Sequence, residues 1–492
     1  MVTPSLQDFL RTAKEGKYTP LRRRIPADLE TPVSVFLKLK SGGATFLLES
    51  VERGIQMGRY SFIGISPVAT IQLRGGTIAV ERGTQRTEFA LGDRDPLSVL
   101  RDELARSPVL LSDDIPPGPI GGAVGYLSYD LARYFESLPE PERNPLGLPD
   151  YSFLVPSAVV IFDHVKSEIE IVSLPEGDDA EAAFGAASDR LHGIYQALMS
   201  PLEISNGAAP PSGPRETEAS NVTEDHFKDI VAGAKEYILS GDAFQIVLSQ
   251  RLQGKTTTTP FQIYRALRIL NPSPYMFFVD FGEFQLIGSS PEVLVKLDKR
   301  AATLCPIAGT RPRGASAAED DALEEELVTN EKERAEHVML VDLGRNDLGR
   351  VCEMGSVATE ALMHVEKYSH VMHLVSRITG TLKPGLDGFD LVRASFPAGT
   401  LTGAPKIRAM EIISELEGEK RGPYGGAVGY FSPQGDVDLC ITIRTIVMAG
   451  DRYYVQGGAG IVADSDPGAE YQETLNKVQA LRKAVLVAEK GL

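Results

Sequence analysis

The chain has 492 residues, of which 42% are hydrophobic, so it is long enough for two domains or one large duplicated fold. Its net charge of −17 argues against nucleic acid or an anionic membrane surface as a partner. An anionic substrate would therefore need local positive charge or a metal ion. The three cysteines show no metal-ligand spacing, and neither a signal peptide nor a spanning apolar run is visible. These features predict a reduced, soluble, cytoplasmic protein.

The first 200 residues are predicted to be rich in strands. An N-terminal arm carries the basic run Leu21-Arg22-Arg23-Arg24, which we interpret as a solvated face because the chain as a whole is acidic. Apolar and aromatic alternation predicts strands over residues 33–39, 44–48 and 58–64, and further strands to about residue 173. A helix is predicted over residues 178–199.

Residues 200–222 are rich in Pro, Gly, Ser and Ala and form the one clear linker in the sequence. We therefore expect an N-terminal domain of residues 1–205, a linker of residues 206–222 and a second domain of residues 223–492. Thr223 looks like the start of a helix, and strands and helices then alternate irregularly. That pattern favours an α+β fold over repeated βαβ units.

One segment of the first domain recurs in the second. Residues 118–128 and 422–432 are identical at nine of eleven positions, and both read as a strand opened by glycines. The two domains are therefore expected to share a β scaffold. The copies differ at Ile120 against Tyr424 and at Leu127 against Phe431, so only the second copy offers a phenol near its start. This difference points to chemistry in the second domain.

Two pairs of glutamates give the strongest general signal for a metal site. Glu333 and Glu336 are three residues apart in a predicted helix over residues 322–343, and Glu470 and Glu473 repeat that spacing in the last helix. Facing pairs would suit Mg²⁺, which takes one or two protein carboxylates and completes its shell with water and substrate oxygens. Each pair taken alone is more often a solvated helix face.

The most distinctive stretch is residues 396–406, Phe-Pro-Ala-Gly-Thr-Leu-Thr-Gly-Ala-Pro-Lys, which precedes a predicted helix. Free backbone N–H groups at that helix start suit an anion, and the stretch equally suits a plain helix–helix connection. The small residues 457–460 follow a strand and would let an anion approach the backbone. Arg444 suits a carboxylate clamp or a structural ion pair. His373 belongs to a group of three histidines without metal-ligand spacing, so a core or surface role is the simpler interpretation.

Together these motifs resemble the chorismate-utilising enzymes, and among them the anthranilate synthase component I family. The resemblance covers nearly the whole chain. It is carried by long motifs in one order, at residues 306–314, 336–348, 368–376, 399–406, 425–431 and 457–460. It implies an α+β fold of two large β-sheets packed face to face, with helices outside.

The resemblance also implies a reaction and partners. Members convert chorismate and ammonia to anthranilate and pyruvate with Mg²⁺, the first committed step of tryptophan biosynthesis. The ammonia comes from a glutamine amidotransferase subunit with no counterpart here, so a separate partner chain and a heterotetramer of two large and two small subunits are expected. Isochorismate-forming relatives carry a lysine where this chain has Gln245, and aminodeoxychorismate synthases carry one where it has Ala308. Both differences favour anthranilate synthase.

By the same resemblance, each candidate residue has an expected role. Mg²⁺ would bind Glu336 and Glu473, with Glu333 and Glu470 behind them through water, and would neutralise the ring carboxylate of chorismate. Glu292 would be the acid for loss of the ring hydroxyl and would need a raised pKa. His373 would polarise the leaving hydroxyl or assist removal of the C2 proton, and Thr400 would add a donor to the ring carboxylate. The remaining contacts to chorismate would come from Gly309, Thr310, Tyr424, Arg444, Gly458, Ala459 and Gly460.

The first domain resembles a feedback site for tryptophan, which would bridge two segments that are distant in sequence. The alternative is ordinary strand and turn packing, which the family resemblance disfavours. The residues implied by the resemblance are Glu49, Ser50, Ser61, Asn271, Pro274, Tyr275 and Met276.

Two alternatives stay open. The first is an aminodeoxychorismate synthase component I, which Ala308 disfavours. The second is a non-catalytic tryptophan-sensing subunit, which would require a damaged metal site, whereas all four glutamates are present.

Overall fold

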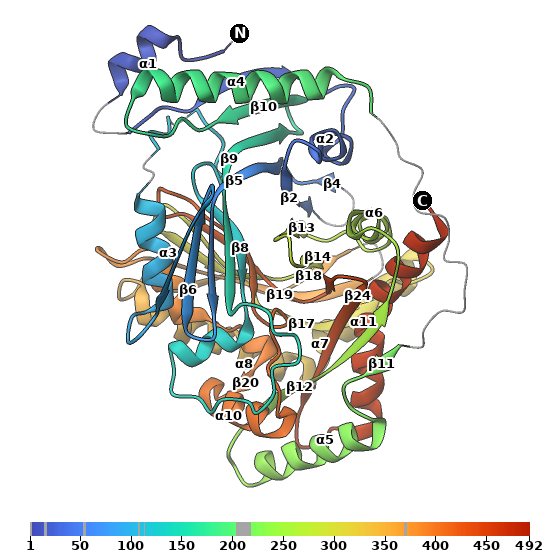
Figure 1. Cartoon of the computed structure of the whole chain (residues 1–492). Helices are drawn as coiled ribbons and strands as arrows, with labels where there is room; N and C mark the ends of the chain where they lie inside the picture. Colours follow the sequence, from blue (N-terminus) through green and yellow to red (C-terminus); the bar gives the residue numbers. More distant parts are fainter. Residues whose placement is uncertain are drawn as a thin grey trace.

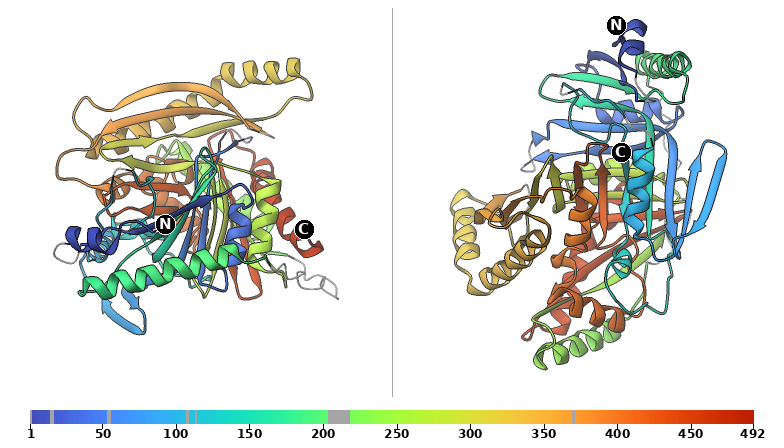
Figure 2. Two further views of the ribbon diagram at one scale, coloured as in Figure 1. Left: turned by 90° about the horizontal axis from the view of Figure 1, so that it is seen from above. Right: turned by 90° about the vertical axis from the view of Figure 1, so that its left-hand side faces the viewer.

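The computed structural model describes residues 2–13, 17–52, 56–106, 109–112, 114–202, 218–368 and 371–492. Strands from the whole chain lie inside, and long helices lie outside (Figures 1 and 2). Helix α4 (Ala180–Met199) covers one side, whereas α7 (Ala317–Thr329) and α8 (Glu331–Val351) project from another (Figure 2). The predicted α+β fold with helices outside is confirmed. Most of the predicted linker falls outside the described residues, and the domain boundaries stay a prediction.

The elements before the linker alternate strands with mostly short helices. They are α1 (Leu6–Thr12), β1 (Leu21–Pro26), α2 (Pro32–Leu39), β2 (Ala44–Glu49), β3 (Val51–Glu52), β4 (Gln56–Met57), β5 (Tyr60–Arg74), β6 (Thr77–Arg82), β7 (Gln85–Ala90), α3 (Pro96–Ala105), β8 (Ala123–Leu127), the 3₁₀ helix η1 (Tyr129–Tyr134), β9 (Tyr151–Asp163), β10 (Glu168–Ser173) and α4.

The elements after the linker continue the same mixture and end in a long helix. They are β11 (Ala219–Ser220), α5 (Glu224–Leu239), β12 (Gln245–Lys255), α6 (Pro260–Leu270), β13 (Tyr275–Asp280), β14 (Gln285–Ser290), β15 (Val293–Asp298), β16 (Ala301–Leu304), β17 (Ile307–Pro312), α7, α8, β18 (Ala358–Lys367), β19 (Val371–Thr381), α9 (Gly388–Ser395), η2 (Gly399–Leu401), β20 (Gly403–Ala404), α10 (Lys406–Glu417), β21 (Ala427–Phe431), β22 (Val437–Ile441), β23 (Thr445–Ala449), β24 (Arg452–Ile461) and α11 (Pro467–Lys490).

Among the described residues, 22 strands join into one hydrogen-bonded network, and β3 and β4 form a separate ribbon. Strands from before and after the linker pair directly in two places, β2 with β13 and β8 with β21. One apolar cluster lies between the layers of this network, and its members come largely from strands, including Phe62, Tyr126, Phe277 and Val447. Helices pack on the outer faces, where α2, α4, α6 and α11 cover one cluster and α3 and α9 cover another. The strand network therefore forms the inside of the molecule.

The two copies of the sequence repeat pair with each other. β8 and β21 run antiparallel with Gly125 opposite Gly429, and these two glycines occupy the same position in the repeat. Ala123 lies opposite Phe431, and Leu127 lies opposite Ala427, so each copy meets the other in an equivalent way. The copies are thus related by a local twofold axis at the glycine pair. This confirms the expectation that the two parts share a β scaffold.

Glycines in the repeat allow this close approach of backbones. A Cβ on Gly122 would lie 2.1 Å from the carbonyl oxygen of Phe431, and one on Gly426 would lie 2.0 Å from that of Leu127. At the axis, a Cβ on Gly125 would lie 2.0 Å from the carbonyl oxygen of Ser152. These are backbone contacts that no side-chain rotation relieves, so the sequence requires glycine at these positions.

The prediction of a strand over residues 33–39 is wrong, because the segment forms helix α2. Thr31 and Ser34 make a capping box at its start, and Pro32 occupies the first helical turn. Val35, Phe36 and Leu39 then share one buried face. The local capping signal outweighs the preference of valine and phenylalanine for strands.

Two further expectations are corrected. The basic run at Arg22 is not simply a solvated face, because Arg22 is buried and pairs with Glu170 (2.6 Å) and Asp114 (2.8 Å). The predicted helix over 322–343 is broken at Asn330, which ends α7 and caps α8 by accepting from the Glu333 N–H.

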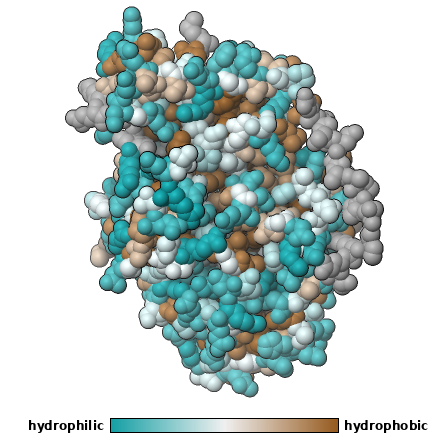
Figure 3. All heavy atoms as spheres, viewed as in Figure 1, coloured by the Kyte–Doolittle hydropathy of each residue, from teal (hydrophilic) through white to brown (hydrophobic). Residues whose placement is uncertain are grey.

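Hydrophilic residues predominate on the face shown in Figure 3, as expected from the high net charge. No described helix has the length and apolar character needed to cross a membrane.

We expect Gly125→Ala to lower the free energy of unfolding by about 1–3 kcal/mol or more, because the new methyl group meets backbone atoms. Urea denaturation followed by circular dichroism measures this change. The control is Gly185→Ala in the exposed part of α4, where nothing lies within 4 Å of the new Cβ. The control should gain about 0.5–1 kcal/mol. Equal stability of Gly125→Ala and the wild type would contradict the account of the repeat.

Candidate active site

The small residues 457–460, predicted to follow a strand, lie within β24 itself. β24 pairs with β12 as far as Ile461, but with β23 only as far as Val455. Among the described residues, no strand pairs with the second edge of residues 456–461. At that edge the carbonyl oxygen of Gly458 accepts a hydrogen bond from Lys477 Nζ at 2.9 Å. Several of the predicted site residues gather around this edge.

Glu292 lies buried between β14 and β15. Thr400 Oγ1 donates a hydrogen bond to Glu292 Oε1 over 3.1 Å. Burial raises the pKa of Glu292 to about 8, and the bond from Thr400 opposes only part of this rise. Glu292 is therefore protonated at neutral pH, which is the state that a general acid needs.

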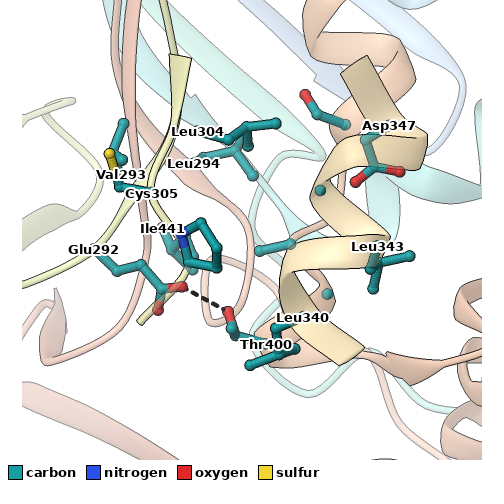
Figure 4. A pocket seen from close by; sticks show the side chains of 15 residues that line it. Glu292, Val293, Leu294, Leu304, Cys305, Leu340, Leu343, Asp347, Thr400 and Ile441 are labelled. Carbon is teal, nitrogen blue, oxygen red and sulfur yellow. Dashed lines mark hydrogen bonds between the residues drawn. The ribbon is translucent and has the colours of Figure 1, made fainter. Parts of the chain in front are cut away.

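Thr400 is positioned by the distinctive loop of residues 396–406. At the end of the loop, Lys406 Nζ donates to Asp347 Oδ2 (2.9 Å) and to the Ser395 carbonyl (3.0 Å). Both charged groups are buried, so this ion pair ties the loop to α8. A cavity of about 40 Å³ lies between the loop, α8 and β15–β16, with Glu292 and Thr400 on one side and Asp347 on the other (Figure 4). This volume suits water rather than a substrate.

His373 lies on β19 opposite Thr310 of β17. Its Nδ1 is 3.0 Å from Thr310 Oγ1 and 3.2 Å from the carbonyl oxygen of Gly309. Burial lowers the pKa of His373, so the ring is neutral at pH 7. Because the Gly309 carbonyl can only accept, Nδ1 carries the proton and Nε2 is the basic nitrogen. The predicted residues Gly309, Thr310 and His373 thus form one group.

The predicted metal-binding glutamates lie on α8 and α11, and all four have polar partners, with Ser465 the hydrogen-bond partner of Glu470. Glu336 Oε1 accepts from Gln245 Nε2 at 2.8 Å. Glu473 pairs with Lys477 at 2.6 Å, and Glu333 pairs with Arg311 at 2.9 Å. Burial raises the pKa of Glu336, and the neighbouring carboxylates Glu333 and Glu473 add to that rise. Burial also raises the pKa of Glu470, again with a contribution from Glu473.

Among the described residues, no three His, Cys, Asp or Glu side chains are close enough to hold a metal ion by themselves. The structure therefore does not bring the four glutamates into a closed cage. Glu336 and Glu473 still act on each other across the site, and a cation would relieve their repulsion. Two carboxylates are enough for Mg²⁺, which keeps water and substrate oxygens as its other ligands. These residues fit an ion that binds together with its substrate.

Arg444 and Tyr424 form a second polar group beside β24. Arg444 is partly buried, and desolvation lowers the pKa of its guanidinium while Tyr424 and Glu473 oppose the shift. A Cβ on Gly458 would lie 2.7 Å from Tyr424 Oη, so a glycine is needed where the phenol approaches the strand. Ala459 instead packs into the apolar cluster on the other face, and its backbone pairs with Leu248 of β12, so it is Gly458 and Gly460 that face the free edge. Arg444 takes a φ of 50°, an uncommon conformation for a residue with a side chain.

The sequence reasoning missed Lys477, which lies at the centre of these groups. Its charge lowers the pKa values of Glu292, Glu336 and Glu470. The signal was available in the sequence, because Lys477 follows Glu473 by four residues in a predicted helix.

A separate cavity of about 330 Å³ brings together five of the seven predicted inhibitor residues. They are Glu49, Ser50, Pro274, Tyr275 and Met276. Glu49 and Met276 pair across β2 and β13, so the cavity bridges segments from before and after the linker, as predicted. Ser61 and Asn271 are not among its lining residues.

The side chains of Ser61 and Asn271 form hydrogen bonds with residues outside the lining of this cavity, and Glu49 already has hydrogen-bond partners of its own. Ser61 Oγ is 2.8 Å from His164 Nε2, and Asn271 Nδ2 donates to Ser289 Oγ at 3.0 Å. The buried Glu49 carboxylate accepts from Arg268 Nε at 2.8 Å and from the Tyr264 hydroxyl. Glu49 is therefore fixed beside the cavity before any ligand arrives.

The chorismate binding enzyme family model matches residues 44–483 of this chain. The chain belongs to the chorismate binding enzyme family. It is 45% identical to anthranilate synthase component 1 of Acetivibrio thermocellus over 99% of both chains. It is 47% identical to the Thermus thermophilus protein of the same name, with 96% of this chain and 99% of that one covered.

The crystal structure of anthranilate synthase component I from Streptococcus pneumoniae TIGR4 is similar in fold, with a TM-score of 0.74 and 40% identity. The match covers 86% of this chain and 92% of that one. The family and the fold implied by the sequence motifs are thus confirmed. The roles of individual site residues stay predictions.

The raised pKa of Glu292 predicts a specific pH dependence of stability. Between the ordinary value of 4.5 and about 8, the folded chain holds a proton that the unfolded chain has lost, so stability falls as pH rises through this window. The slope from this group is about 1.4 kcal/mol per pH unit. We therefore expect Glu292→Gln to become more stable than the wild type as pH rises from 5 to 8. Urea midpoints measured at several pH values test this, and parallel curves for the two proteins would contradict it.

Proposed function

We propose that this chain is the large subunit of an anthranilate synthase, a lyase that converts chorismate and ammonia to anthranilate, pyruvate and water. The observation that carries the proposal is full-length similarity to proteins of that name, together with the glutamate pairs on α8 and α11. Gln245 supports ammonia as the nucleophile, because an amide that donates to Glu336 cannot serve as a base that activates water. Ala308 distinguishes the chain from aminodeoxychorismate synthases.

In this proposal Mg²⁺ is held by Glu336 and Glu473, with Glu333 and Glu470 behind them. The ion supplies positive charge for the ring carboxylate of chorismate, which an acidic chain otherwise lacks. The free edge of β24 offers backbone donors from Gly458 and Gly460 to the same carboxylate, and Ala459 between them keeps the strand paired with β12. Arg444 and Tyr424 hold the carboxylate of the enolpyruvyl group.

The proposed chemistry has two steps. Ammonia forms a bond to ring C2 while the C4–O bond breaks and the hydroxyl leaves as water, taking a proton from the protonated carboxyl of Glu292; the ammonium formed at C2 then returns a proton to that carboxylate. In the second step C2 loses its proton and the C3–O bond breaks, which makes the ring aromatic, and the released enolpyruvate gains a proton from water at its methylene carbon and becomes pyruvate. Neutral His373, with Nε2 as its basic atom, is the proposed acceptor of that proton. Thr400 orients Glu292 toward the leaving hydroxyl.

We further propose that a glutamine amidotransferase subunit supplies the ammonia in a heterotetramer of two large and two small subunits. The designation of the relatives as component 1 supports a second component. The free thiols of Cys305, Cys352 and Cys440 fit the reduced cytoplasm expected from the sequence.

We propose that tryptophan binds the cavity beside Glu49 and inhibits the reaction. In this role Glu49 meets the amino group of the ligand, and Met276 and Pro274 pack on its indole ring. The support is the cavity itself, which gathers most of the predicted residues and has room for an amino acid of this size.

The activity can be tested with chorismate, an ammonium salt and Mg²⁺, followed by anthranilate fluorescence. We expect fluorescent product without any added lyase, and accumulation of an amino-chorismate intermediate instead would favour the aminodeoxychorismate alternative. Glu336→Gln should lower kcat/KM roughly 100-fold or more. The control is Glu325→Gln on the exposed face of α7, which should leave activity unchanged. Full activity in Glu336→Gln would refute the metal assignment.

The inhibitor site can be tested with Ser50→Phe, because a phenyl group at this position fills the cavity. We expect at least a 10-fold rise in the tryptophan concentration that halves activity, which corresponds to a loss of about 1.4 kcal/mol in binding. Titration of the ammonia-dependent activity with tryptophan measures this change. Inhibition that is unchanged from the wild type would place the inhibitor elsewhere.

A further inference from the structure

Among the described residues, Arg421 has the largest side chain that is fully buried, with 2% of its surface exposed. A buried guanidinium is stable only when its donors are paired. Nε donates to Glu417 Oε2 at 2.8 Å, and Nη2 donates to Glu417 Oε1 at 2.6 Å. Nη1 donates to the Leu401 carbonyl (2.8 Å) and Nη2 to the Val247 carbonyl (2.6 Å). One side chain thus ties together α10, the loop before it and β12.

The same guanidinium lies over two aromatic rings. Its central carbon lies 4.5 Å from the centroid of Tyr129 and 5.9 Å from that of Tyr424. Both distances fall within the range of cation–π contacts. Tyr129 belongs to η1, directly after the first copy of the repeat, whereas Tyr424 belongs to the second copy and to the candidate active site. Arg421 therefore connects the first part of the chain to a residue proposed to hold the substrate.

The residues that Arg421 contacts are close in sequence to other residues of the candidate site. Leu401 follows Thr400, and Val247 lies two residues after Gln245 on β12. Glu417 also accepts from the backbone N–H and the hydroxyl of Ser249, and Ser249 lies opposite Gly458 in the β12–β24 ladder. The network thus reaches the loop, the phenol and the glycine strand, and of these the phenol of Tyr424 is the group proposed to hold the enolpyruvyl carboxylate.

We propose that Arg421 is a positioning residue that sets the end of the pocket where the enolpyruvyl carboxylate binds. This inference rests on the proposed function, because it needs chorismate as the ligand. Arg421 lies over the ring of Tyr424 and acts through it, whereas its bonds to Leu401 and Glu417 hold the guanidinium in place. A lysine would keep the charge beside Glu417, but it lacks the planar fork that reaches three acceptors while lying over two rings.

The test compares ligands that differ only at this end of the pocket. Arg421→Lys is assayed for KM of chorismate with ammonium and Mg²⁺, and for inhibition by benzoate, which has the ring carboxylate but no enolpyruvyl group. We expect KM to rise about 10-fold, as for the loss of one good polar contact, while Ki of benzoate changes less than about 2-fold. An equal rise in both constants would show a general structural defect and overturn the proposal, as would an unchanged KM.

A second pair of variants keeps the test decisive if Arg421→Lys fails to fold. Among the described residues the buried hydroxyl of Tyr129 has no hydrogen-bond partner, so Tyr129→Phe removes an idle group and keeps the ring. Tyr129→Leu removes the ring face that Arg421 contacts. We expect KM for chorismate to stay at the wild-type value in Tyr129→Phe and to rise about 3- to 10-fold in Tyr129→Leu, with benzoate inhibition unchanged in both. Equal KM values in the two variants would overturn the proposal.

The proposed function is tested separately by turnover of the wild-type chain. If the wild type makes no anthranilate, the proposed function fails, and calorimetric titration with chorismate and benzoate still tests Arg421. A selective loss of chorismate affinity in Arg421→Lys then supports the positioning role, and equal affinities refute it.

Discussion

The hydrogen bonds between β8 and β21 join the parts of the chain on either side of the linker. At their centre two glycines of the repeat face each other, and neighbouring backbones come so close that no Cβ fits. This contact fixes how the first copy of the repeat lies against the second. As a consequence Tyr129, which follows the first copy, reaches the guanidinium that supports Tyr424 in the second. The geometry of the candidate active site thus depends on a backbone contact between the two parts of the chain.

The carboxyl groups at the two ends of the site differ in their burial and in their charged neighbours. At one end Glu292 is buried beside Thr400, so it keeps its proton at neutral pH. At the other end Glu336 and Glu473 keep polar partners in Gln245 and Lys477, which limits their mutual repulsion. The first arrangement suits donation of a proton, and the second suits a cation that arrives with an anionic substrate. The surroundings of each side chain therefore distinguish a proton-donating carboxyl, Glu292, from the cation-binding carboxylates Glu336 and Glu473.

Much of this architecture follows from local sequence signals. The helix N-cap at Thr223 was predictable because capping depends on a few neighbouring residues. The two repeat strands were predictable because the glycines that open them mark a local backbone geometry. Helix α2 was missed because a capping box outweighed strand-like composition. The break at Asn330 was missed because one asparagine both ends α7 and caps α8.

Some site residues were also predictable from the sequence and others were not. Helical spacing indicated the glutamate pairs, and motif resemblance indicated Glu292 and Thr400. Neither gave a sign of Arg421, because two of its acceptors are backbone carbonyls of residues distant in sequence. Such contacts leave no pattern of residue types. Lys477 was within reach of local reasoning through its spacing from Glu473. Ser61 and Asn271 were placed at the inhibitor cavity by resemblance, and the fold directs their side chains to His164 and Ser289 instead.

The central claim is that a substrate and a divalent cation bind together between α8, α11 and the free edge of β24. A crystal structure of the chain with Mn²⁺ and chorismate, collected for anomalous scattering, tests it most directly. The account predicts an anomalous peak between the carboxylates of Glu336 and Glu473, with Lys477 moved away from Glu473 and the substrate beside residues 458–460. An ion bound away from these carboxylates, or chorismate bound with Lys477 still paired to Glu473, would contradict it.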